Sequence, residues 1–194
     1  MKLEILFGIN RPDLVTAFLS GFERRYPSSI HVPAAWRMLA HVQFDQGFHE
    51  EALANYRRVL QADAQDKEAR LGEAIALYRL GRANEAGQRE RSLRDATTLT
   101  ADDEIRLSLE EGHALFRARD FLGAIDAFAK VVQNHPESEW ADDALIAQGR
   151  AATQSGRIEP AVVAFEKLIR DFPDSPLRQR AAFELGNAYY AMQF

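Results

Sequence analysis

The chain has 194 residues, 46% of them hydrophobic and 27% charged, which is an ordinary composition for a globular protein. Its formal charge at pH 7 is −5, so the composition gives no electrostatic support for binding nucleic acid. There is no cysteine, which excludes disulfides, thiol catalysis and cysteine-ligated zinc, and no apolar run approaches the length of about 18 residues that suggests a membrane span.

The first predicted element, residues 13–30, reads as an amphipathic helix, as does almost every later segment, because Ala, Leu, Glu and Arg predominate and strand signals are nearly absent. Residues 13–26 of this segment align with residues 159–172, which places Val15 opposite Ala161. We therefore expect it to be the second helix of a two-helix repeat, whose first helix is either missing or formed by residues 1–8.

The next four elements, residues 33–66, 67–100, 101–138 and 139–175, share one internal spacing. A small residue is followed after twelve residues by a second one, and in three of the four elements an aromatic residue stands four residues later. These sets are Ala40, Ala52 and Tyr56; Ala74, Ala86 and Glu90; Gly112, Ala124 and Phe128; and Gly149, Ala161 and Phe165. Seven residues after the first small residue lie Gly47, Gly81, Arg119 and Gly156. We interpret each element as two antiparallel helices that approach closely at the small residues and are joined by a turn with a positive φ angle.

Two of these elements have features of their own. Glu90 takes the place of the packing aromatic residue in residues 67–100, so we expect this repeat to be degenerate and the least well packed. Residues 101–138 are preceded by Thr100, which stands with Asp103 in the spacing of a capping box.

The last element, residues 176–194, places Gly186 opposite Gly149 and is therefore predicted to be the first helix of a repeat. A stack of helix pairs needs terminal repeats with polar outer faces. Since this element is rich in apolar residues, we expect the chain to be a fragment of a longer array, or to be capped by self-association.

The spacing resembles that of tetratricopeptide repeats, and the first complete repeat carries the family pattern best, in Trp36, Leu39, Ala40, Gly47, Ala52 and Tyr56. The resemblance covers residues 13–194 and implies an all-α fold, a right-handed superhelix of stacked antiparallel helix pairs (an α-solenoid). The 37-residue repeats with an aromatic–Pro–x–Ser junction are also similar to those of bacterial cell-envelope repeat proteins, such as the Tol-Pal coordinator and the outer-membrane barrel-assembly lipoprotein. This likeness slightly favours a bacterial periplasm, and a cytoplasmic location stays open.

The resemblance also implies that the first helix of each repeat lines a concave groove, at positions three before, one after and four after the small residue. These positions carry Arg37, His41, Phe44, Ile75, Tyr78, Leu109, His113, Phe116, Arg150, Asn187 and Tyr190. Aromatic faces with a few hydrogen-bond donors suit a peptide that carries apolar side chains and some acidic groups. The alternative is that the aromatic row packs in the core, where Phe44 would fill the space left by Gln43 in place of the family's usual tyrosine.

No motif for catalysis, cofactors or metals accompanies this pattern. The five histidines are His31, His41, His49, His113 and His135. They do not pair in a metal-binding spacing on one helix, and neither a nucleophile motif nor a glycine-rich phosphate loop is present. Acidic pairs such as Asp142 and Asp143 open helices, where carboxylates are favoured by the helix dipole. We therefore expect no enzymatic activity, no cofactor and no metal ion.

The sequence thus predicts a non-enzymatic scaffold that binds a protein or peptide in its groove and mediates the assembly of a protein complex. Two alternatives stay open. The chain could be a self-assembling module that forms a dimer or a higher oligomer through its terminal helices, or it could be the docking or regulatory region of a longer multidomain protein. Nucleic acid is not expected among its partners.

Overall fold

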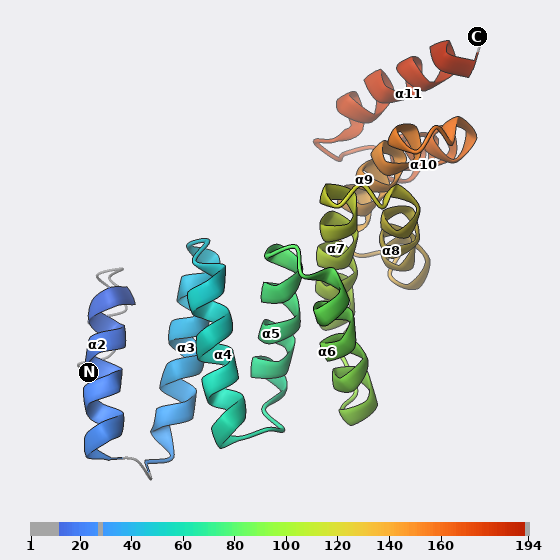
Figure 1. The fold of residues 1–194 in the computed structure, drawn as a ribbon. Helices are drawn as coiled ribbons and strands as arrows, with labels where there is room; N and C mark the ends of the chain where they lie inside the picture. Colours follow the sequence, from blue (N-terminus) through green and yellow to red (C-terminus); the bar gives the residue numbers. More distant parts are fainter. Residues whose placement is uncertain (1–11, 27–28, 193–194) are drawn as a thin grey trace. The chain divides into compact units, whose positions relative to one another are not determined.

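The computed structural model describes residues 12–26 and 29–192 of the chain (Figure 1). Within these two ranges it contains ten α-helices and no strand, which confirms the predicted all-α fold. The helices are α2 (Pro12–Arg25), α3 (His31–Asp45), α4 (His49–Ala62), α5 (Lys67–Arg79), α6 (Ala83–Ala96), α7 (Ala101–Arg117), α8 (Phe121–Asn134), α9 (Ala141–Gln154), α10 (Ile158–Asp171) and α11 (Arg178–Met192). The suggested first helix at residues 1–8 lies outside the described residues, as do residues 27–28 of the first expected element and 193–194 of the last.

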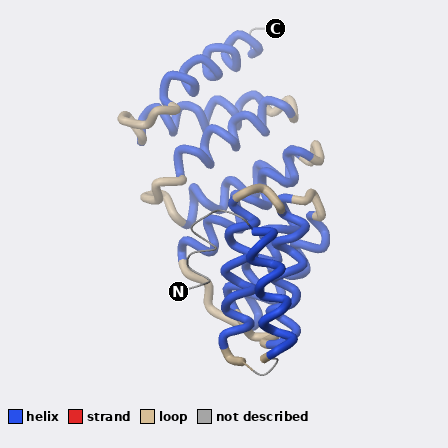
Figure 2. Tube along the Cα trace, turned by 90° about the vertical axis from the view of Figure 1, so that its left-hand side faces the viewer, coloured by secondary structure: helices blue, strands red, loops and turns tan. Residues whose placement is uncertain are grey.

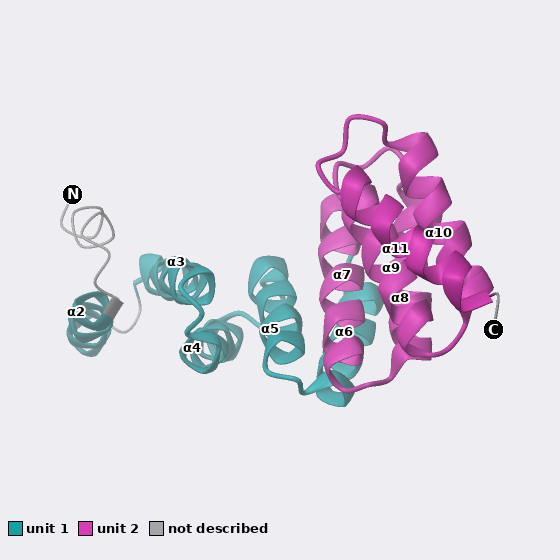
Figure 3. Ribbon diagram, turned by 90° about the horizontal axis from the view of Figure 1, so that it is seen from above, with its two compact units in different colours: residues 1–98 teal, residues 99–194 magenta. Residues whose placement is uncertain are grey.

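The helices fall into two compact units, which we call unit 1 (residues 1–98, with α2 to α6) and unit 2 (residues 99–194, with α7 to α11; Figure 3). In each unit, helices that follow one another along the chain pack against each other. Figure 2 shows that short loops connect them. Each unit is therefore a stack of helices, in which we call α3, α5, α7, α9 and α11 first helices and α2, α4, α6, α8 and α10 second helices. The division of the chain into repeats that begin at residues 33, 67, 101, 139 and 176 stays a prediction.

A residue with a positive φ angle follows four of the first helices. Gly47, Gly81, Arg119 and Gly156 have φ angles of 85°, 75°, 63° and 77°. These are the four residues that the sequence places seven positions after the first small residue, so the predicted turn is confirmed. The turn lets the chain close back on the helix, as where the amide of Phe48 donates to the carbonyl of Gln43 at 2.8 Å. Arg119 adopts this conformation at a cost of about 1 kcal/mol, which glycine does not pay.

The close approach of first and second helices depends on glycines beneath aromatic rings. A Cβ atom built on Gly112 would lie 2.6 Å from Cε1 of Phe128, and one built on Gly149 would lie 2.6 Å from Cζ of Phe165. Both rings are fully buried. In unit 1 the ring of Tyr56 lies instead against Gly72 of α5, so it joins two consecutive helix pairs. The predicted small-residue contact is thus present, and Gly72 is a further one that the spacing rule did not identify.

The second helix pair, α5 and α6, was expected to pack worst, and its second helix buries only Ala86, Glu90 and Leu93, whereas its first helix is well buried. Every residue of α5 from Leu71 to Tyr78 is buried. The hydroxyl of Tyr78 donates to Oε2 of Glu90 at 2.8 Å, and Arg94 donates to the other oxygen of this carboxylate at 2.8 and 2.9 Å. Glu90 is therefore buried with its hydrogen bonds satisfied, and a polar contact replaces the missing aromatic one.

A charged cluster ties three helices of unit 1 together. Arg57 of α4 donates to Glu73 of α5 at 2.9 Å and also to Glu85 of α6. Hydrogen bonding to Glu73 raises the pKa of the Arg57 guanidinium, although partial burial opposes this effect. The side chain of Glu73 is only 6% exposed and forms ion pairs with Arg57 and with Arg89, the latter at 3.4 Å.

The predicted capping box at the start of α7 is confirmed. The hydroxyl of Thr100 accepts a hydrogen bond from the amide of Asp103, and the Asp103 carboxylate accepts one from the amide of Thr100 at 2.9 Å. Two of the otherwise unpaired amides at this helix end are satisfied reciprocally.

The glycine contact can be tested with two substitutions at the same position of the repeat. Gly149→Ala pushes a methyl group into the ring of Phe165, so we expect it to lower the free energy of unfolding by about 1–3 kcal/mol. Gly186 has no atom within 4 Å of a built Cβ, so Gly186→Ala should raise this free energy by about 0.4–1 kcal/mol. Urea unfolding followed by circular dichroism measures both. Equal effects of the two variants would contradict the role assigned to the ring.

Candidate functional site

The eleven residues predicted to line a groove all lie on first helices. Arg37, His41 and Phe44 belong to α3, Ile75 and Tyr78 to α5, Leu109, His113 and Phe116 to α7, Arg150 to α9, and Asn187 and Tyr190 to α11. Within one helix they are three or four residues apart, which places them on one face. Their surroundings differ strongly, however, and we describe each unit by itself.

The predicted residues of α3 are half-buried, and each already contacts a neighbouring side chain. Arg37 forms an ion pair with Asp66, the residue that also caps α5. The ring of His41 is hydrogen-bonded through Nδ1 to the hydroxyl of Tyr56 at 2.9 Å. The ring of Phe44 lies 4.9 Å from that of His49, measured between centroids. These side chains therefore hold α3 to α4 and α5, and leave only part of their surface for a ligand.

The predicted residues of α5 are buried. Ile75 is 2% exposed and Tyr78 is 1% exposed, and the only polar atom of the Tyr78 side chain donates to Glu90. In this fold neither offers contact area to a ligand. Their groove role stays a prediction, and their position favours the alternative that part of the aromatic row packs in the core.

Unit 2 presents a more open surface along α7 and α9. His113 is exposed and lies edge-on to Phe128, with ring centroids 5.1 Å apart. Phe116 is half-buried, because one side of its ring meets Phe121 at 5.4 Å and it packs against the core together with Leu109. The guanidinium of Arg150 lies 5.8 Å from the centre of the Phe116 ring, which is within the range of a cation–π contact. The structure thus brings Phe116 and Arg150 together across two first helices.

The last helix, α11, adds exposed aromatic residues. Tyr190 is 65% exposed and Asn187, one turn before it, is exposed as well. Phe183 is 69% exposed and lies on the same face, at the position three residues before Gly186. Tyr189 points elsewhere, because its hydroxyl donates to Glu166 of α10, and this hydrogen bond raises the pKa of Tyr189. The exposed face of unit 2 therefore carries Phe116, Arg150, Phe183, Asn187 and Tyr190, which we call the α7–α11 face.

Several contacting residues were missed by the sequence analysis. Arg79 places its guanidinium 5.9 Å from the centre of the Phe44 ring, and Arg58 lies 4.1 Å from that of Trp36. Phe121 and His49, which pack on the groove aromatics, each stand five residues after them and begin a second helix. This repeated spacing of five was visible in the sequence and could have identified both.

The acidic pair that was expected to open a helix is not part of the α7–α11 face. Asp142 and Asp143 are in the first turn of α9, as expected. Burial raises the pKa of Asp143, and the neighbouring Asp142 adds to the effect. In residues 12–26 and 29–192 there is no group of three or more His, Asp or Glu side chains arranged to hold a metal ion. Over the same residues, no helix combines the length and the apolar character that crossing a bilayer requires.

Comparison with family models identifies the repeats. Residues 37–98 and residues 143–175 each match a model described as tetratricopeptide repeat. No curated protein matches the chain. The narrower likeness to cell-envelope repeat proteins is not among these matches and stays a prediction.

Solved structures share the fold at low sequence identity. A MamA protein superposes with a TM-score of 0.64 and 23% identity, over 84% of each chain. A tetratricopeptide repeat protein from Parabacteroides merdae gives a TM-score of 0.70 and 18% identity, over 99% of this chain and 74% of that one. YrrB, described as a TPR protein with an unusual peptide-binding site, gives 0.61 and 17%, over 89% and 84%. These similarities confirm the architecture of stacked helix pairs.

Alanine substitutions should separate packing residues from surface residues in the predicted aromatic row. Tyr78→Ala removes a fully buried ring and should lower the free energy of unfolding by about 3–5 kcal/mol. Tyr190→Ala removes a largely exposed one and should change it by no more than about 0.5 kcal/mol. Chemical unfolding of both variants beside the native chain measures this difference. A large loss for Tyr190→Ala would show that this ring is also a packing residue.

Proposed function

We propose that the chain binds a protein or peptide partner and serves as a scaffold for assembling a protein complex, because residues 37–98 and 143–175 match models of tetratricopeptide repeats. The observation that carries this proposal is the α7–α11 face of unit 2. It combines an arginine stacked on a phenylalanine with three further exposed residues, none of which is needed to fill the core.

Arg150 gives this face its chemical preference. A guanidinium group offers several N–H donors in one plane and pairs well with a carboxylate. Its stacking on Phe116 leaves these donors accessible at the edge, since Arg150 is exposed. A ligand that suits the site has an acidic group for Arg150 and apolar side chains for the rings of Phe183 and Tyr190, while Asn187 can bond to its backbone.

The face on α3 is a weaker candidate. Arg37 is paired with Asp66 and His41 with Tyr56, so a ligand would have to compete with existing contacts. Binding hot spots are enriched in tyrosine, tryptophan and arginine, and Arg150 and Tyr190 of unit 2 are exposed, whereas Arg37 and His41 are half-buried. We therefore place the principal binding surface in unit 2, in a fold that YrrB, a TPR protein with a peptide-binding site, also has.

Selection of a library of short random peptides on the immobilised chain tests the proposal. We expect enrichment of peptides that combine an acidic residue with apolar ones. Arg150→Glu and Tyr190→Ala should each weaken the selected peptides at least about tenfold, the loss expected for a binding hot spot.

The matched control is Arg157→Glu, which reverses the same charge in the loop before α10. It should leave the affinity unchanged. Selected peptides that bind native chain, Arg150→Glu and Tyr190→Ala equally well would place the binding surface elsewhere. A selection without any enrichment would count against peptide binding by this chain.

A second candidate function is self-assembly through α11. Gly186 is exposed, whereas Gly112 and Gly149 at equivalent positions each lie beneath a phenylalanine ring. The free space over Gly186, between Phe183 and Tyr190, can receive an aromatic ring from a second copy of the chain, as Gly112 and Gly149 receive Phe128 and Phe165. Sedimentation equilibrium over a wide concentration range should then show a dimer or higher oligomer that Gly186→Leu abolishes. A particle that stays monomeric at all concentrations would rule this candidate out.

A further inference from the structure

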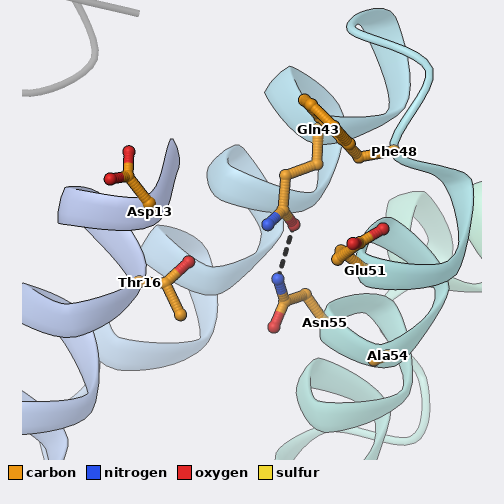
Figure 4. A pocket seen from close by; sticks show the side chains of 7 residues that line it. All are labelled: Asp13, Thr16, Gln43, Phe48, Glu51, Ala54 and Asn55. Carbon is orange, nitrogen blue, oxygen red and sulfur yellow. Dashed lines mark hydrogen bonds between the residues drawn. The ribbon is translucent and has the colours of Figure 1, made fainter. Parts of the chain in front are cut away.

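A cavity of about 550 Å³ lies in unit 1 between α2 and α4, away from the first-helix positions described above (Figure 4). Its size is typical of ligand-binding clefts, which measure about 300–1,000 Å³. It is lined by Asp13 and Thr16 of α2, Gln43 of α3, and Phe48, Glu51 and Asn55 at α4. A comparable cavity of about 570 Å³ lies between α8 and α10 of unit 2 and provides a reference for it.

Two buried amides meet in the cavity of unit 1. Nδ2 of Asn55 donates to Oε1 of Gln43 at 2.6 Å, and the two residues are only 9% and 5% exposed. Figure 4 shows this pair between α3 and α4, with Asp13 and Thr16 on the neighbouring α2. Within the described part of the chain, Nε2 of Gln43 and Oδ1 of Asn55 make no hydrogen bond, and neither is among the fully buried atoms without a partner, so both are open to the cavity. Exchanging the oxygen and nitrogen of both amides would still leave one donor and one acceptor.

The amide pair is not required by the stacking of helices. The positions equivalent to Gln43 carry Leu77, Leu115 and Ala152, and those equivalent to Asn55 carry Arg89, Ala127 and Ala164. In unit 2, Ala152 and Ala164 are 0% and 4% exposed, so the same interface packs there without polar groups. Buried polar groups are normally fully hydrogen-bonded. A donor and an acceptor that open into a cavity, at positions where unit 2 uses only apolar residues, indicate a recognition site.

We infer that this cavity binds a peptide segment with a basic side chain. One peptide carbonyl accepts from Nε2 of Gln43, and a neighbouring N–H donates to Oδ1 of Asn55. The ring of Phe48 is 47% exposed and offers an apolar surface to the methylene groups of a lysine or arginine side chain. Glu51 is exposed at the edge of the cavity, and no lysine or arginine stands among the described residues that line it. The charge of the site therefore favours a cation.

This site differs from the α7–α11 face in place and in chemical preference. It lies between second helices of unit 1 and is lined by carboxylates and amides, whereas the face of unit 2 is built on Arg150. The two can be tested independently, because Arg150→Ala alters one and leaves the other intact.

Titration of the nitrogen-15-labelled full chain with the peptide N-acetyl-Ala-Lys-Ala amide tests the inference by NMR. We expect saturable shifts of the side-chain amide resonances of Gln43 and Asn55. Glu51→Gln should weaken this peptide about two- to fivefold, as expected for the loss of one exposed ion pair. The neutral peptide N-acetyl-Ala-Leu-Ala amide should bind native chain and Glu51→Gln alike, and more weakly than the lysine peptide binds native chain.

The combined variant Gln43→Leu, Asn55→Ala introduces residues that equivalent positions of the repeat already carry, so it should fold. We expect it to weaken the lysine peptide at least about tenfold. Gln148→Leu in the reference cavity and Arg150→Ala should have no effect.

Three results would overturn the inference. The lysine peptide could give no saturable shift, which would mean that the cavity holds only water. The combined variant, shown to be folded by circular dichroism, could bind the peptide as native chain does. If that variant does not fold, the test rests on Glu51→Gln. An affinity of Glu51→Gln for the lysine peptide equal to that of native chain would then reject the proposed ligand.

Discussion

The contact between an aromatic ring of a second helix and a glycine of a first helix sets the geometry of both units. Where Phe128 and Phe165 lie over Gly112 and Gly149, the two helices come too close for any side chain at the glycine. This proximity fixes the rotation of each first helix, because only one face can carry the glycine. The next residue is consequently turned towards the edge of the ring, as His113 is against Phe128. The candidate surface thus follows from a packing constraint.

Sequence spacing predicted those parts of the structure that depend on local chain geometry. The left-handed turns at Gly47, Gly81 and Gly156, and the capping box at Thr100, need only a few neighbouring residues and were identified from their positions alone. The burial of a side chain could not be predicted from local spacing in the same way. Tyr78 and Tyr190 occupy equivalent positions, yet one is 1% exposed and the other 65%, because exposure depends on which other helices cover a first helix. A repeat pattern specifies the register of a residue, while its accessibility depends on distant parts of the chain.

The degenerate helix pair shows a second limit of pattern reasoning. A glutamate at an aromatic position predicts poor packing if the pattern is treated as a list of required residue types. Glu90 is nevertheless buried and satisfied, because Tyr78 and Arg94 supply donors to both of its carboxylate oxygens. A polar group in the interior is tolerated when its hydrogen bonds are complete, and the partners that complete them come from positions that the repeat leaves variable.

The same freedom explains how one chain can carry two surfaces of different chemistry. In a linear array each helix pair contacts only its neighbours, so a substitution changes one site without altering the rest. Gln43 and Asn55 occupy positions where the helix pairs of unit 2 use leucine or alanine, and their amides are bonded to each other in a cavity of unit 1. Arg150 occupies the position of His41 and His113 and instead lies over Phe116 in unit 2. Because the glycine–aromatic contacts hold the helices in place, the residue types at the positions of Gln43, Asn55 and Arg150 are not fixed by packing. They can therefore be adapted to a ligand. The residues that depart from the repeat without weakening it are therefore the ones in which specificity should be sought.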